Sequence, residues 1–391
     1  MSLYIKFNIE KSAANSDKNS GNKHESFFFS GEASIPSQGI TGVYGASGVG
    51  KTTLLRLIAG LDRHQNTIVN FNQESWQNSQ AFLPAHHRHA ALIFQHRSLL
   101  PHLSVNKNLD FSAALGAKKS PEHLIQQLPD KTTLCQWFGI AELLPLAINK
   151  LSAGQSQRVS IVRALLSKPK VLLLDEPLAN LDAESKVTIL NYLHKISLEY
   201  DLPMLYVSHS LDEITQIADH LLLISRESDS NVSKSIIEAF ASLDDASCNL
   251  NSAFAALPEA SAILKCKIKQ HDHKHGLSKL CLGETSLYLQ KMALAEGTEI
   301  KLRVPARDVS INLEHTCTSS ILNILPATIV EIKQLSDAKV IIKLKIGQQF
   351  LLATITLKSL LALKLNVGQA VYAQIKSIAL PAHNFISHHF E

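Results

Sequence analysis

The amino-acid sequence predicts an α/β domain with an inserted helical subdomain, followed by an all-β domain. Short apolar runs, each followed by a longer amphipathic segment, indicate a mostly parallel α/β sheet: ITGVYG, HAALIF, KVLLLDE and PMLYVSH. Between Gln95 and Leu165 no comparable run occurs, and the pattern there favours helices. From about Ala262 onward the runs become short and β-like with turns between them, which predicts an all-β module.

The bulk composition is that of a globular protein and excludes several classes of function. Of 391 residues, 45% are hydrophobic and 18% are charged, and the net charge of +4 is too small to indicate a nucleic-acid surface. The five cysteines form no C-x-x-C pair, which favours reduced thiols in the cytoplasm. The sequence shows no signal-peptide pattern and no apolar run of the roughly 20 residues that span a bilayer. If the protein works at a membrane, another chain must supply the spanning helices.

Changes of pattern along the chain predict its organisation. Residues 11–26 are polar and of low complexity, and we expect an exposed loop there between two N-terminal strands. The polar stretch RESDSNVSKS beyond residue 226 marks a break in composition. The predicted units are an α/β domain over 1–240 with its helical subdomain at about 96–165, a linker over 241–261, and a β-module over 262–391 in two halves, about 262–315 and 318–380.

A phosphate-binding loop is predicted by the stretch GASGVGKTT. It follows the strand ITGVY and precedes the helical TLLRLIAGL, which is the setting that the G-x-x-x-x-G-K-[ST] pattern requires. Backbone N–H groups and the helix N-terminus would surround the phosphates, Lys51 would reach the β- and γ-phosphates, and the Thr52 hydroxyl would hold Mg²⁺. The expected ligands are therefore ATP and Mg²⁺. The predicted nucleotide site here comprises Gly45, Ala46, Ser47, Gly48, Val49, Gly50, Lys51, Thr52 and Thr53.

The run VLLLDE predicts the other half of the catalytic site. Four apolar residues form a buried strand, and Asp175 follows at its carboxyl end, where open α/β sheets bind their ligands. Asp175 would join Thr52 in the Mg²⁺ shell. Glu176, the next residue, would act as the base that activates water for attack on the γ-phosphate.

With these two motifs in place, the chain resembles the ATP-binding-cassette (ABC) ATPases. LSAGQ, at residues 151–155, is similar to the family signature Leu-Ser-Gly-Gly-Gln, with Ala153 in place of one glycine. The resemblance implies a P-loop ABC ATPase fold in which Ser152, Gly154 and Gln155 bind the ATP held by a second subunit. Ala153 adds only a methyl group, so the change should be nearly silent if its φ angle is negative.

Three further motifs of the family follow in the expected order. Gln95 in LIFQH resembles the glutamine that contacts Mg²⁺ and the attacking water. Asp182 in ANLD resembles the aspartate of the loop that crosses the dimer interface, and His209 in LYVSHS resembles the histidine that contacts the γ-phosphate. The resemblance implies Glu176, His209 and Gln95 as catalytic residues. The aromatic residue that stacks on adenine cannot be assigned, since Tyr4, Phe27, Phe28 and Phe29 are all candidates.

The C-terminal part narrows the resemblance to importers. TSSILNILPATIVEI with YAQIKSIAL resembles the molybdate-binding OB-like (MOP) domain of molybdate importer ATPases, and PMLYVSHSLDEI also resembles that subfamily. This implies a homodimer of ATPase subunits on the cytoplasmic face of the inner membrane, energising molybdate uptake. The implied partners are two integral-membrane permease subunits and, indirectly, a periplasmic or surface molybdate-binding protein, with no nucleic acid.

An oxyanion site of that domain is matched only in part. Ser320, Lys376 and Ser377 agree with the family pattern, but Leu322 stands where the family has arginine. A missing guanidinium removes a charge-assisted interaction typically worth about 1.5–3 kcal/mol, so we expect weak oxyanion binding or none.

Other functions remain open at this point. The same importer role could serve sulfate, tungstate, iron, a polyamine or a sugar. A non-transport ABC ATPase is disfavoured, because the chain has neither sustained heptads nor a second phosphate loop. The β-module could also act by itself as a molybdate sensor or store.

Overall fold

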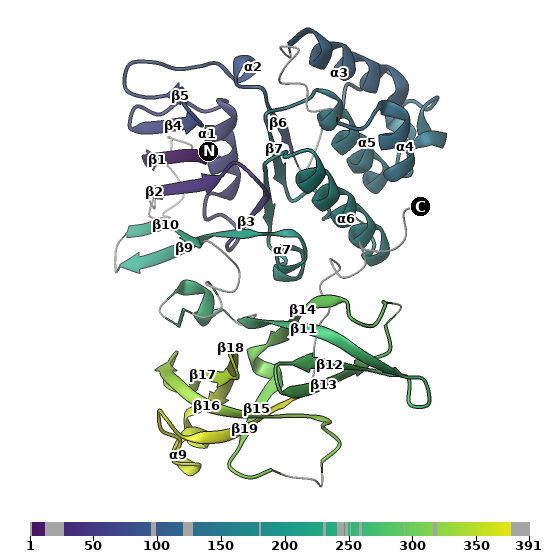
Figure 1. Ribbon diagram of the computed structural model, residues 1–391. Helices are drawn as coiled ribbons and strands as arrows, with labels where there is room; N and C mark the ends of the chain where they lie inside the picture. Colours follow the sequence, from purple (N-terminus) through teal and green to yellow (C-terminus); the bar gives the residue numbers. More distant parts are fainter. Residues whose placement is uncertain are drawn as a thin grey trace, which may run out of the picture. The chain divides into compact units, whose positions relative to one another are not determined.

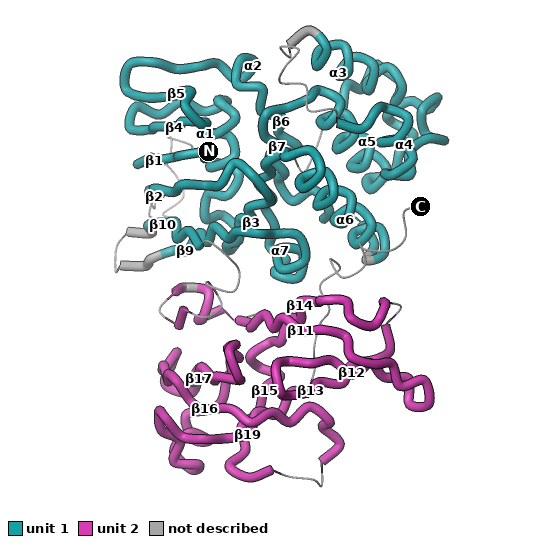
Figure 2. Tube along the Cα trace, in the orientation of Figure 1, with its two compact units in different colours: residues 1–240 teal, residues 241–391 magenta. Residues whose placement is uncertain are grey.

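The computed structural model places the chain in two compact units, Met1–Phe240 and Ala241–Glu391 (Figure 1, Figure 2). It describes residues 2–11, 27–94, 99–119, 128–179, 181–229, 232–240, 246, 249–250, 252–257, 260–292, 294–315 and 319–376. In that part of the chain, no helix is both long and apolar enough to cross a bilayer.

The first unit is built on a ten-stranded sheet with the strand order β5-β4-β1-β2-β10-β9-β3-β8-β7-β6. The strands are β1 Ser2–Lys11, β2 Phe27–Pro36, β3 Ile40–Tyr44, β4 Thr67–Phe71, β5 Glu74–Gln77, β6 Ala90–Ile93, β7 Val171–Asp175, β8 Met204–Ser208, β9 His220–Asp229 and β10 Val232–Phe240. The four apolar runs of the sequence are β3, β6, β7 and β8, and these pair in parallel as predicted.

The rest of this sheet is less parallel than the sequence pattern suggested. The pairs β1–β2, β1–β4, β4–β5 and β9–β10 are antiparallel, whereas β2 pairs in parallel with β10 and β9 pairs in parallel with β3. Strand β1 buries alternate residues, Leu3, Ile5, Phe7 and Ile9, as expected where one face of a sheet is covered. The described residues of the polar stretch after residue 226 lie in the paired strands β9 and β10, so the break in composition falls inside the first unit.

Helices supply the remaining structure of this unit, including the predicted insertion. They are α1 Lys51–Ala59, α2 Ala85–Arg88, α3 Val105–Lys119, α4 Lys131–Trp137, α5 Ala153–Leu166, α6 Ala183–Glu199 and α7 Leu211–Ile217, with short 3₁₀ turns at Ala141–Leu143 and Ile148–Lys150. In the insertion, α3 and α4 both pack against α5, which also contacts β6. Helix α1 packs against β6, β7 and β8, and it carries the phosphate loop at its N-terminal end.

A buried arginine anchors the other end of α1. The Arg88 guanidinium is fully buried and donates to the carbonyl oxygens of Leu57 (2.8 Å) and Ile58 (3.0 Å), which close α1. It also donates to the carbonyl oxygens of Leu83 and Trp76. Burial lowers the pKa of Arg88 to about 10, so the side chain stays charged at neutral pH. The helix that carries the phosphate loop is thus held at its C-terminus by a cation, as its dipole favours.

Replacing this arginine is expected to destabilise the first unit. Arg88→Met would remove the guanidinium donor from four backbone carbonyl oxygens, of which those of Leu57 and Trp76 keep a backbone N–H donor, at a cost of about 2–4 kcal/mol in the free energy of unfolding. The matched control is Arg63→Met, because Arg63 is exposed and lies over the Phe82 ring at 5.2 Å from its centroid. Thermal unfolding of both variants measures the difference, and equal midpoints would contradict the anchoring role.

The second unit consists of two antiparallel sheets. One has the order β13-β12-β11-β14 and the other β15-β19-β16-β17-β18. The elements are β11 Ser261–Asp272, β12 Leu277–Leu282, β13 Thr285–Gln290, β14 Glu299–Pro305, β15 Val309–Asn312, β16 Asn323–Gln334, β17 Lys339–Ile346, β18 Gln349–Thr356, α9 Leu357–Ala362 and β19 Ala370–Ile375, with short 3₁₀ turns at Ala253–Ala256 and Ala306–Asp308. Strand β15 lies in the first predicted half of the β-module, which ends at about residue 315. It nevertheless pairs with β19 of the second half, so the two predicted halves share one sheet.

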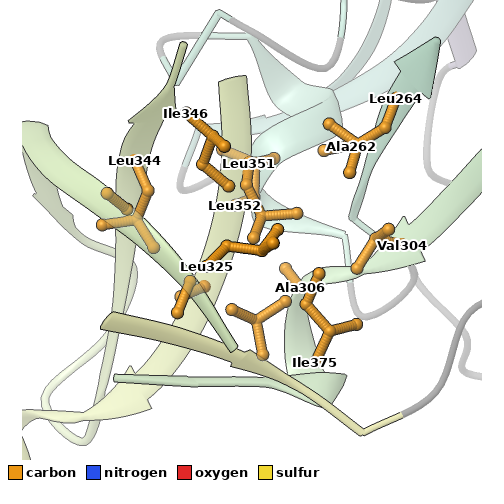
Figure 3. Close-up of a cluster of buried hydrophobic side chains, with 14 of the residues drawn as sticks. Ala262, Leu264, Val304, Ala306, Leu325, Leu344, Ile346, Leu351, Leu352 and Ile375 are labelled. Carbon is orange, nitrogen blue, oxygen red and sulfur yellow. The ribbon is translucent and has the colours of Figure 1, made fainter. Parts of the chain in front are cut away.

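Both sheets bury their inner faces in one apolar core (Figure 3). Leu264 and Val304 from the first sheet lie in the same cluster as Leu325, Leu351 and Ile375 from the second. Part of the segment predicted as a linker belongs to this core as well. Its small apolar residues Leu250, Ala255 and Ala260 are buried there, because they cover sheet surface that would otherwise meet water.

Candidate functional site

The candidate site lies where three neighbouring parallel strands end. Strand β8 pairs with β3 on one side and β7 on the other, with Ser208 opposite Tyr44 and Val207 opposite Asp175. The residues that follow each strand are therefore brought to one edge of the sheet: the phosphate loop after β3, Glu176 after β7, and His209 after β8. Residues far apart in the sequence meet because parallel strands align their carboxyl ends.

Two positions in the phosphate loop require glycine in this structure. A Cβ atom at Gly45 would lie 2.4 Å from the carbonyl oxygen of Ile224, a backbone atom that cannot move aside. Gly50 has φ of 110° and would bring a Cβ within 2.8 Å of the buried Phe29 ring. The sheet therefore lies directly under the loop, and its packing holds the loop backbone in a tight curve. Because Phe29 serves this core, it is a poor candidate for the aromatic residue that stacks on adenine.

Lys51 is held inside the curve of the loop. Its Nζ donates to the carbonyl oxygens of Gly45 (2.8 Å) and Ala46 (3.0 Å), and the side chain is buried. Burial lowers the pKa of Lys51, while the negative charges of Glu176 and Asp175 act in the opposite direction. A desolvated ammonium group that faces the loop interior suits a ligand with several negative charges, such as a polyphosphate.

Thr52 and Asp175 are in direct contact. The Thr52 hydroxyl donates to Oδ2 of Asp175 at 2.7 Å, which links the start of α1 to the end of β7. Burial raises the pKa of Asp175, the Thr52 hydrogen bond lowers it, and the nearby Glu176 charge raises it. A hydroxyl and a desolvated carboxylate side by side are oxygen ligands of the kind that Mg²⁺ prefers. These two residues therefore fit the predicted Mg²⁺ shell.

Glu176 and His209 form a second contact at the same edge. Nδ1 of His209 lies 3.3 Å from Oε2 of Glu176. Glu176 has φ of 48°, a left-handed conformation that is uncommon for residues other than glycine, and its N–H donates to the carbonyl oxygen of Val207 at 3.1 Å. Unusual backbone of this kind is concentrated at functional sites, where surrounding structure holds it in place. Here it turns the carboxylate toward the histidine.

The signature residues lie at the start of α5. Ser152 is the N-cap, and its Oγ accepts from the Gln155 N–H (3.2 Å) while Oε1 of Gln155 accepts from the Ser152 N–H (2.9 Å). This capping box pairs the N–H groups of Ser152 and Gln155, while the N–H groups of Ala153 and Gly154 at the start of the helix have no acceptor in a preceding turn. Ala153 is the first helical residue and does not have a positive φ, so the glycine-to-alanine difference costs no backbone strain.

The remaining predicted site residues are a helix N-cap, two residues outside the described part of the chain, and residues of the second unit. Asp182 is the N-cap of α6 and its carboxylate accepts from the Ser185 N–H at 2.9 Å, which lowers its pKa. Gln95 lies outside the described residues, as does Ser377. In the second unit, Ser320 and Lys376 are exposed, and Leu322 has 62% of its surface exposed. An exposed leucine in the arginine position adds an apolar side chain where an oxyanion needs a donor.

One group of functional interest was not predicted from the sequence. Glu213, in the first turn of α7, is buried and accepts hydrogen bonds from Tyr206 and Ser208 of β8. Its other oxygen is paired with Lys186 of α6 at 2.8 Å. In the sequence, Glu213 is marked only by its position four residues after His209. That position does not distinguish a buried glutamate from an exposed one on a helix.

Comparison with known proteins finds two matching families and a similar solved structure. The ABC transporter family matches residues 31–179, and the TOBE domain family matches residues 319–380. A solved dimeric ATP-binding cassette in a post-hydrolysis state, bound to ADP and phosphate, is 21% identical with a TM-score of 0.46 and covers 56% of this chain and 93% of that one.

The curated relatives match over nearly the whole chain. The molybdenum import ATP-binding protein of Pseudomonas savastanoi pv. phaseolicola is 41% identical over 359 residues, covering 90% of this chain and 94% of the relative. Those of Azotobacter vinelandii and Hahella chejuensis are 38% and 36% identical, covering 89% and 88% of this chain and 94% and 93% of the relatives. This chain therefore belongs to the ABC transporter ATP-binding proteins, in the family of the molybdenum import ATP-binding proteins.

Proposed function

We propose that this chain is the ATP-hydrolysing subunit of an ABC importer and that the importer takes up molybdate. The observation that carries the ATPase assignment is the meeting of Lys51, the Thr52–Asp175 pair and the Glu176–His209 pair at one edge of the sheet. The cargo is supported by the relatives, which are named as molybdenum import proteins and match both units of this chain.

The chain's own residues suggest how hydrolysis proceeds. The phosphate loop and Lys51 hold the β- and γ-phosphates of ATP. Glu176 accepts a proton from the attacking water, whose oxygen forms a bond to the γ-phosphorus as the bond to the bridging oxygen of ADP breaks. His209 orients the base and the γ-phosphate. Mg²⁺, held by Thr52 and Asp175 and by Gln95 as the resemblance implies, would neutralise phosphate charge when bound.

The start of α5 supports a dimer as the active form. Helix N-termini with unpaired N–H groups attract phosphate, and that of α5 carries Ser152 and Gly154 of the signature. The capping hydrogen bonds of Ser152 join it to Gln155, within the same turn. We propose that Ser152, Gly154 and Gln155 bind the ATP of a neighbouring subunit, with Asp182 near the interface. Each of the two ATP molecules would then lie between two chains.

The same proposal places the chain in a larger assembly. Two permease subunits would supply the membrane-spanning helices, and a periplasmic or surface molybdate-binding protein would deliver the cargo to them. The ATPase dimer would bind the permease on the cytoplasmic face of the inner membrane. In the second unit, oxyanion binding by Ser320, Lys376 and Ser377 is expected to be weak because Leu322 provides no hydrogen-bond donor.

Uptake of radiolabelled molybdate tests the cargo. Cells that lack other molybdate importers would express the permease, the binding protein and either this chain or its Lys51→Ala variant. We expect uptake only with the unmodified chain, competed by tungstate and much less by sulfate. Competition by sulfate as strong as that by tungstate would indicate a general oxyanion importer. Absence of molybdate uptake despite ATP hydrolysis would point to iron, a polyamine or a sugar.

A further inference from the structure

A buried carboxylate joins three elements behind the Glu176–His209 pair. Oε2 of Glu213 accepts hydrogen bonds from the hydroxyl groups of Tyr206 (2.9 Å) and Ser208 (2.8 Å). Oε1 of Glu213 lies 2.8 Å from Nζ of Lys186, and the carboxylate side chain is only 10% exposed. Three donors thus compensate one desolvated negative charge, which keeps the arrangement of strand and helices specific.

The contacts of Ser208 extend this network to the backbone around His209. The Ser208 hydroxyl donates to Glu213 and accepts from the N–H of Ser210 at 3.0 Å, so it joins the residues on either side of His209. Ser210 in turn caps α7 by accepting from the Glu213 N–H at 3.3 Å. The backbone that carries His209 is therefore tied at both sides to Glu213, while the His209 ring itself is 62% exposed and contacts Glu176.

Lys186 extends the network in the other direction, to the start of α6. Its N–H donates to the carbonyl oxygen of Asp182, the residue that caps this helix. Its side chain crosses to Glu213 on α7, and the two helices pack against each other. A displacement at the start of α6 would thus be passed to Glu213 through its ion pair with Lys186. Glu213 would pass it on, through its hydrogen bond from Ser208, to the backbone beside His209.

We propose that Glu213 is a positioning residue: its carboxylate holds the backbone that carries His209 beside Glu176 and couples it through Lys186 to the start of α6. The inference rests on the proposed ATPase function, in which the start of α6 lies near the neighbouring subunit. Glu213 acts through two contacts, its ion pair with Lys186 and its hydrogen bond from Ser208. The chemistry of hydrolysis remains that of Glu176, and these residues determine its geometry.

The primary test compares two lysines of similar exposure in the full chain. Lys186→Met breaks the ion pair with Glu213, and Lys170→Met breaks the pair of Lys170 with Glu74 at 3.0 Å; the lysine side chains are 29% and 34% exposed. We expect Lys186→Met to lower kcat for ATP about tenfold with KM within about twofold, because positioning acts on the transition state and not on ATP binding. Lys170→Met should leave both constants unchanged.

Two further comparisons separate positioning from a general loss of structure. Lys186→Arg keeps a positive donor and should restore kcat to within about threefold of the unmodified chain. Ser208→Ala and Tyr206→Phe each remove one hydroxyl donor to the same oxygen of Glu213. Ser208→Ala should lower kcat more, because Ser208 alone of these two also holds the Ser210 N–H next to His209.

The outcomes decide between the inference and its alternatives. If kcat of Lys186→Met stays within about twofold of the Lys170→Met value, the inference is wrong. A fall in ATP affinity as large as the fall in kcat, or no recovery with arginine, would show a merely structural role. If the unmodified chain hydrolyses no ATP, the proposed function itself fails. If it does hydrolyse ATP and Lys51→Ala does not, the ATPase assignment stands whatever the Lys186 result.

Discussion

Lys51→Ala is expected to abolish ATP turnover, with a loss of at least about 10²–10³-fold, because it removes a preorganised cation from the transferred phosphate. The nucleotide-free protein should keep its stability. Burial lowers the pKa of Lys51, so the ammonium group is held at a desolvation cost, and removing it offsets the loss of its hydrogen bonds to the carbonyl oxygens of Gly45 and Ala46. Steady-state hydrolysis and the thermal unfolding midpoint measure the two effects.

Ligand-induced stabilisation separates lost binding from lost chemistry in this variant. A ligand at 100 times its Kd raises the free energy of unfolding by about 2.7 kcal/mol, and we expect ATP with Mg²⁺ to stabilise the unmodified chain but not Lys51→Ala. Lys170→Ala is the matched control, since Lys170 lies at the start of β7 outside the phosphate loop. Turnover by Lys51→Ala at the rate of the unmodified chain would show that the phosphates bind elsewhere.

Glu176→Gln is expected to retain ATP binding and lose hydrolysis by about 10²–10⁴-fold, because the amide cannot accept the proton of the attacking water. The amide has nearly the same shape, so the phosphate loop and the Thr52–Asp175 contact should persist. With ATP bound and not hydrolysed, the dimer should accumulate, which size-exclusion chromatography with and without ATP detects. Full hydrolysis by this variant would overturn the assignment of Glu176 as the base.

Two controls isolate the role of this carboxylate. Glu199→Gln changes a carboxylate at the far end of α6, paired with Lys195 at 3.9 Å, and should leave hydrolysis unchanged. Glu176→Gly should also be inactive but at least as stable as the unmodified chain. Glycine adopts the φ of 48° without the roughly 1 kcal/mol that other residues lose there. An inactive but stable glycine variant would show that the backbone is strained for function.

Much of the fold could be predicted because it follows from local pattern. The runs that became β3, β7 and β8 are buried along their whole length, and strands of a covered parallel sheet need such continuous apolar residues. The run that became β6 is equally apolar, but β6 is the last strand of the sheet and is only partly buried. The antiparallel strands β4 and β5 were missed, because they are short and hold charged and polar residues beside their buried ones. The buried part of the predicted linker was missed as well, since small apolar residues are common in both linkers and cores.

The phosphate loop, the carboxylates at the end of β7 and the family could all be predicted from residue types at fixed short spacing. Which of these residues meet follows from the tertiary structure. It placed Glu176 against His209, closed Thr52 onto Asp175, and showed Ala153 at a helix start where its methyl group causes no strain. It also showed that Glu213 is buried among three donors. These contacts join residues on separate strands and helices, so they depend on sheet order and register, which short-range sequence spacing does not encode.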